Sequence, residues 1–165
     1  MTVALTRPVM TRDAFMAWAH RQSGKYEFDD RIPLAMTRVT YAHAEICQNI
    51  YAALRARLLG SSFRVVGPDS AILTAGSSVR CPDAVVTGTR PPADSYVIPD
   101  PVIVFEVSSP STWPTDSVIK AREYQGVPTI LRYVMIETSG VGLLVLSRKQ
   151  GSDAWTAEAL LSADH

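Results

Sequence analysis

Apolar positions along the chain recur with two spacings, one typical of helices and one typical of strands. In residues 40–59, apolar side chains return every four positions, which places them on one face of a helix, and Gly60 marks the end of that helix. A shorter helix is expected at residues 12–22, with Thr11 as its N-cap. A third is expected at residues 114–125.

Runs of apolar and β-branched residues between these helices predict strands. Residues 25–28 and 32–36 flank a short polar turn and predict a hairpin. Within it, Glu27 points away from the face shared by Tyr26 and Phe28. The order of elements predicts an α/β fold, with a mixed β-sheet flanked by helices and preceded by an N-terminal helix and a β-hairpin. Six further strands are expected, at residues 63–66, 71–74, 83–87, 102–107, 131–136 and 141–147.

Composition narrows the class of protein. A chain of 165 residues with 47% apolar and 19% charged residues fits one globular domain, which we expect to span residues 1–165. Sixteen basic and sixteen acidic residues cancel, so phosphate binding would have to be local. Two cysteines exclude a disulfide framework. Because we find neither a signal-peptide core nor a run of about 18 apolar residues, we expect a soluble, cytoplasmic protein.

The run "VIVFEV", residues 102–107, raises the question of why it contains Glu106. Its other five residues are apolar, which is typical of a strand covered on both faces. An unpaired buried carboxylate costs several kcal/mol, so Glu106 needs a metal ion, a cationic side chain or a proton. Asp83 opens another apolar strand, directly after Pro82. If the two strands are neighbours, Asp83 and Glu106 come close enough to share a divalent cation.

Lys120 is the cationic candidate, and two interpretations of it are open. In the expected helix at residues 114–125, Asp116, Lys120 and Glu123 share one face. An exposed pair of Lys120 with Asp116 would contribute only a few tenths of a kcal/mol. Alternatively, Lys120 points at the carboxylates of the strands.

Several segments, taken in order, resemble one known family. They are "KYEF" with its acidic turn, His43 at the start of a long helix, "CPDAVV", "VIVFEVSSPST" and "DSVIKAREYQGVP". Over residues 11–148 they resemble the Uma-type family of restriction endonuclease-like proteins, in the PD-(D/E)xK nuclease superfamily. The most specific part is "EVSSPST" followed by Asp116, Lys120 and "EYQGVP". The resemblance implies a restriction endonuclease-like fold.

The resemblance also implies an activity, the hydrolysis of phosphodiester bonds of nucleic acid, with DNA as the expected partner. The implied cofactor is Mg²⁺, for which Mn²⁺ can substitute. Asp83 and Glu106 would be the metal ligands and, with Lys120 and Glu27, the catalytic residues. In the parent superfamily a lysine lies two residues after the glutamate, where this chain has Ser108. The resemblance therefore assigns that lysine's role to Lys120, on the following helix.

A second hypothesis has the same fold without catalysis, as a module that binds DNA or a protein partner. Metal binding that depends on Asp83 would distinguish the nuclease from this module. A nuclease of this size is expected to act as a homodimer or beside a separate DNA-reading protein. For His43, both a structural role and a place in the wall of the site are open.

Overall fold

The computed structural model describes residues 9–138 and 142–161, and its largest element is a six-stranded mixed sheet. The strand order is β10-β9-β8-β7-β6-β3, with β7 parallel to β8 and the other neighbouring pairs antiparallel. β7 has a neighbour on each side and carries the apolar run that the sequence predicted to be buried. The strands are β3 (Arg64–Val66), β6 (Ala84–Thr87), β7 (Pro101–Ser108), β8 (Arg132–Glu137), β9 (Gly142–Arg148) and β10 (Trp155–Leu161).

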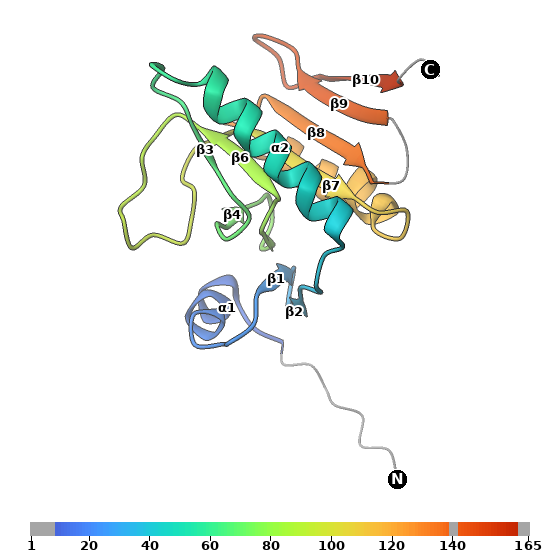
Figure 1. Ribbon diagram of the computed structural model, residues 1–165. Coiled ribbons are helices and arrows are strands. Elements are labelled where there is room, and N and C mark those ends of the chain that lie inside the picture. The colour runs from blue at the N-terminus through green and yellow to red at the C-terminus, as the bar shows by residue number, and fades with distance from the viewer. Residues whose placement is uncertain (1–8, 139–141, 162–165) are drawn as a thin grey trace.

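Helices lie on both faces of this sheet. The long helix α2 (Tyr41–Arg57) crosses one face (Figure 1), and its N-cap Thr40 accepts a hydrogen bond from the backbone N–H of His43. A π-helix, η1 (Thr115–Lys120), continues into α3 (Ala121–Gln125) and packs against β8. There the rings of Tyr124 and Tyr133 lie 4.9 Å apart, inside the main apolar core.

A second, four-stranded sheet combines the N-terminal hairpin with two short strands that follow β3 in the chain. Its order is β2-β1-β5-β4, built from β1 (Tyr26–Asp29), β2 (Ile32–Ala35), β4 (Ile72–Leu73) and β5 (Val79–Arg80). Helix α1 (Arg12–Ala19) packs on it, with Phe15 stacked on Phe28 at a ring distance of 4.6 Å. This contact forms the centre of a smaller, separate core.

The predicted α/β fold is confirmed, and four details differ from the expectation. The short strand β5 and the last strand β10 were not expected, and the single expected sheet is two sheets. The first half of the expected helix at residues 114–125 is a π-helix. Residue 141, in the last expected strand, lies outside the described residues. Within the described ranges, no helix has the length and apolar character needed to cross a membrane.

Candidate active site

Asp83 directly precedes β6, and Glu106 lies on the neighbouring strand β7. The register pairs Ala84 of β6 with Phe105 of β7, so Asp83 and Glu106 are the next residues along in that pairing. Two hydrogen bonds hold Asp83 against β7: its N–H donates to the carbonyl of Phe105 at 3.1 Å, and its Oδ2 accepts from the N–H of Val107 at 2.8 Å. The charge of Asp83 is among the causes that raise the pKa of Glu106. The two predicted acids are therefore neighbours at the start of β6 and on β7.

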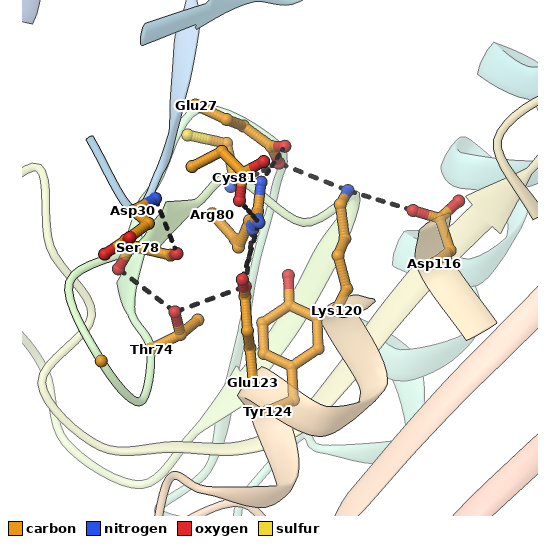
Figure 2. Close-up of polar contacts among 12 residues, drawn as sticks. Glu27, Asp30, Thr74, Ser78, Arg80, Cys81, Asp116, Lys120, Glu123 and Tyr124 are labelled. Atoms are coloured by element: carbon orange, nitrogen blue, oxygen red, sulfur yellow. Dashed lines mark hydrogen bonds and ion pairs between the residues drawn. The ribbon is translucent and has the colours of Figure 1, made fainter. Parts of the chain in front are cut away.

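Lys120 is buried among three carboxylates. Its Nζ lies 3.1 Å from Glu106 Oε1, 3.3 Å from Glu27 Oε1 and 3.2 Å from Asp116 Oδ1. Figure 2 shows the ammonium between Glu27 and Asp116. Lys120 is only 9% exposed, so the alternative of an exposed surface pair with Asp116 is wrong. The expectation that Lys120 points at the strand carboxylates is confirmed for Glu106.

Both residues of the Asp116–Lys120 pair lie in the π-helical segment. Asp116 and Lys120 are both buried, whereas Val118 and Ile119 between them are exposed. The two charged residues therefore face the sheet on the same side, as their spacing of four predicts. Single π-helical turns inside helices are frequent at functional sites.

Glu106 has a cationic partner, which answers the question raised by its position in an apolar strand. Its Oε1 is shared by Lys120 Nζ and by the hydroxyl of Tyr124, which donates at 2.9 Å. Burial raises the pKa of Glu106 to about 8; the charge of Lys120 opposes this rise, and the nearby Asp83 adds to it. Burial lowers the pKa of Lys120, but the charges of Glu106 and its neighbours raise it more, so Lys120 stays protonated.

Glu27 reaches the cluster from the small sheet. Its Oε1 accepts a hydrogen bond from the backbone N–H of Cys81 at 3.1 Å and pairs with Lys120. Its Oε2 lies 3.4 Å from Nη1 of Arg80. Glu27 is therefore a buried member of the same charged cluster.

Arg80 and Glu123 form the part of the cluster that sequence reasoning missed. Arg80 donates from Nε and Nη2 to the two oxygens of Glu123, at 2.6 and 2.7 Å (Figure 2). Its Nη2 also donates to Asp29 at 2.8 Å, and the residue is 1% exposed. The available signal was an arginine between Val79 and Cys81, in an apolar run just ahead of Asp83. Glu123 was expected only on the helix face of Lys120.

Ser108, the position of the parent superfamily's lysine, is fully buried and donates to Oδ2 of Asp116 at 2.7 Å. Asp116 also pairs with Lys120. The hydroxyl of Ser108 and the ammonium of Lys120 therefore contact the same carboxylate. Position 108 on the strand, where the resemblance implies a lysine in the parent superfamily, and Lys120 on the helix thus both reach Asp116.

His43 lies on the other side of Asp83. Its Nε2 is 3.4 Å from Asp83 Oδ2, and its Nδ1 is 3.4 Å from the sulfur of Cys47. The hydrogen bond with Asp83, followed by that with Cys47, raises the pKa of His43 to about 10. A cavity of about 990 Å³ opens here, lined by His43, Cys47, Asp83 and the cationic Lys25 and Arg38. His43 and Asp83 therefore line this cavity together, whereas Glu106, Lys120 and Glu27 do not line it.

The chain thus forms an α/β fold in which buried carboxylates, a lysine and an arginine cluster between its two sheets. The chain belongs to the Uma2 family, described as "putative restriction endonuclease", which matches residues 12–164. An uncharacterised protein of Synechocystis sp. is 26% identical over 148 residues, which cover 88% of this chain and 78% of that relative. A crystal structure of a "putative nuclease" belonging to DUF820 from Anabaena variabilis superposes with a TM-score of 0.71. The superposition covers 94% of this chain and 87% of the Anabaena chain. The two sequences are 15% identical, so the likeness is one of fold.

Proposed function

We propose that this protein is a metal-dependent endonuclease that hydrolyses phosphodiester bonds of DNA with Mg²⁺. The observation that carries the proposal is a buried lysine held against Glu106, on the strand next to that of Asp83. Stability alone gives little reason to bury Lys120 among carboxylates. A buried ion pair rarely stabilises a fold more than apolar residues of similar volume would. Charged groups with strongly shifted pKa values cluster at catalytic sites.

The donor set fits Mg²⁺. This ion prefers oxygen ligands and binds through one or two carboxylates while keeping several waters, and Asp83 with Glu106 supplies two carboxylates. The contacts of Glu106 with Lys120 and Tyr124 use Oε1, which leaves Oε2 for a ligand. When bound, the ion would neutralise the substrate phosphate and lower the pKa of a bound water.

The chain's own residues would orient and stabilise the reacting groups. Lys120, kept protonated, would stabilise negative charge on the scissile phosphoryl oxygens. Glu27 and Asp116 would hold the ammonium in place, since each forms an ion pair with it. Tyr124 would fix the Glu106 carboxylate through its hydrogen bond. Nucleic acid would approach through the cavity of about 990 Å³, where Lys25 and Arg38 supply positive charge and Asp83 lies in the wall.

The test is cleavage of plasmid DNA, single-stranded DNA and RNA with Mg²⁺ or Mn²⁺. We expect the wild type to cut, and we expect Asp83→Asn and Glu106→Gln to abolish cutting. Lys120→Ala should slow cutting by about 10²–10³-fold, the usual cost of losing one group that stabilises transition-state charge. Asp153→Asn, at an exposed pair with Arg148, is the matched control and should cut normally. A wild type that binds DNA but cuts none of the substrates would favour the inactive binding module, and full activity in Lys120→Ala would refute the role of Lys120.

A further inference from the structure

His43, Cys47 and Asp83 bring three different donor atoms together. His43 and Cys47 are four residues apart on α2, so both project from the same side of that helix. Asp83, held against β7 by its hydrogen bonds, meets them there. One donor atom from each residue lies within 4.8 Å of the other two. Within residues 9–138 and 142–161, no other set of three histidine, cysteine or acidic side chains gathers as closely.

This donor set has a different chemical preference from the pair Asp83 and Glu106. A thiolate and an imidazole nitrogen are preferred ligands of Zn²⁺ and related transition metals, whereas Mg²⁺ takes oxygen ligands. Zinc binds such ligands at ~2.0–2.3 Å. Because Asp83 and Cys47 contact different ring nitrogens of His43, Nε2 and Nδ1, binding of one ion requires side-chain rotations that bring one ring nitrogen, the sulfur and an Asp83 oxygen to the same point. Three protein ligands leave a fourth position, and all three residues line the open cavity.

We propose that His43, Cys47 and Asp83 form a zinc site, and that zinc bound there inhibits the nuclease by withdrawing Asp83 from the magnesium site. The inhibition, but not the zinc site itself, rests on the proposed function. Asp83 belongs to both donor sets, and a carboxylate drawn towards His43 and Cys47 is no longer positioned beside Glu106. Zinc therefore competes with magnesium through a shared ligand.

Spectroscopy with Co²⁺ tests the site without any enzymatic assay. Reduced, chelator-treated wild type should bind one Co²⁺ with a thiolate-to-cobalt charge-transfer band, and Zn²⁺ should remove that band. Cys47→Ser should lose the band and bind the metal more weakly, by roughly tenfold or more. Cys81→Ser is the matched control, because Cys81 is the second of the two cysteines, is buried in the smaller core and lies outside this donor set. No thiolate band in the wild type, or a band that survives in Cys47→Ser, would overturn the site.

A second measurement uses the wild type alone and so does not depend on a variant folding. Zinc should slow the alkylation of Cys47 by a maleimide, read by peptide mass spectrometry, while any slower labelling of Cys81 should be unchanged. Equal labelling of Cys47 with and without zinc would contradict the proposal.

Inhibition is tested last. With Mg²⁺ present, micromolar zinc should inhibit cleavage by the wild type and should inhibit Cys47→Ser far less. Equal inhibition of both would refute competition at this site, even if cobalt binds. If the wild type shows no cleavage at all, the proposed function fails while the cobalt and alkylation results still decide the metal site.

Discussion

At the scale of single residues, Glu106 persists in an apolar strand because its partners offset the cost of burial. An isolated buried carboxylate would cost several kcal/mol. Lys120 at 3.1 Å and the Tyr124 hydroxyl at 2.9 Å both contact its Oε1. These contacts do not cancel the cost, because the pKa of Glu106 still rises to about 8. The residue is therefore held at a cost in stability, as is common for functional groups.

The shifted pKa of Glu106 predicts how stability depends on pH. The folded protein binds this proton more tightly than the unfolded chain, so ionisation of Glu106 removes stability as the pH rises from its usual value of 4.5 to about 8. Glu106→Gln has no such ionisation. In chelator, the variant should equal or exceed the wild type in stability at pH 8 and should lose this advantage near pH 4.5.

Urea unfolding at the two pH values measures this prediction. Glu123→Gln is the contrast: it weakens a bidentate partner of the buried Arg80, so it should destabilise the fold at pH 8. Marked destabilisation by Glu106→Gln at pH 8 would show instead that Glu106 acts mainly as a structural partner of Lys120.

At the scale of elements, the sequence predicted regular structure well and irregular structure poorly. Helix α2 and the β1–β2 hairpin follow from apolar spacing and turn residues, which are local signals. β5 has only two residues, too few for any period to show. The π-helical form of η1 was missed because a helical pattern does not distinguish a widened turn from an α-helical one.

Strand β7 and helix η1 both present a side chain to Asp116, and this predicts that a lysine on the strand can partly restore cleavage lost with Lys120. Ser108 contacts Asp116 from the strand, and Lys120 contacts it from the helix. A lysine introduced at position 108 can therefore place its ammonium near the position that Lys120 occupies. We expect Ser108→Lys combined with Lys120→Ala to recover part of the cleavage lost in Lys120→Ala. Recovery should be incomplete, because misplacement by about 1 Å can cost about a hundredfold in rate.

Plasmid cleavage with Mn²⁺ compares the wild type, each single variant and the double variant. Ser108→Lys alone is the necessary control, since two lysines facing Asp116 should repel each other and lower stability. A double variant no more active than Lys120→Ala, although folded by circular dichroism, would contradict the shared position.

At the scale of the whole molecule, the candidate site joins the two sheets, and this is why it could be predicted only in part. Asp83 and Glu106 stand out in the sequence because each interrupts or opens an apolar strand, and the family resemblance added Lys120 and Glu27. The pairing of Arg80 with Glu123 joins residues 43 positions apart, on β5 and α3. Nothing local in the sequence indicates such a contact, because it depends on how the small sheet docks on the large one.

The charged cluster also connects the small sheet to the rest of the molecule. Arg80 extends from β5 to Glu123 on α3, and Glu27 extends from β1 to Lys120 on η1. Apart from Ile72 of β4, which packs in the main core, the buried apolar side chains of the small sheet pack in the smaller core, and these ion pairs add specific polar contacts between the two parts. Burial lowers the pKa of Arg80, but Glu123 and the other nearby acids raise it further, so the guanidinium stays charged.

Removing Arg80 should therefore loosen the small sheet before the large one. Arg80→Met leaves Glu123 and Glu27 buried without their cation, which should cost about 3–5 kcal/mol of unfolding free energy. Hydrogen exchange should speed up in β1, β2 and β5 more than in β6, β7 and β8, because only the small sheet loses its charged anchor. Asp153→Asn, at an exposed pair, should change neither measurement. Uniformly faster exchange across both sheets would mean that they unfold as one unit and that the cluster serves the whole fold equally.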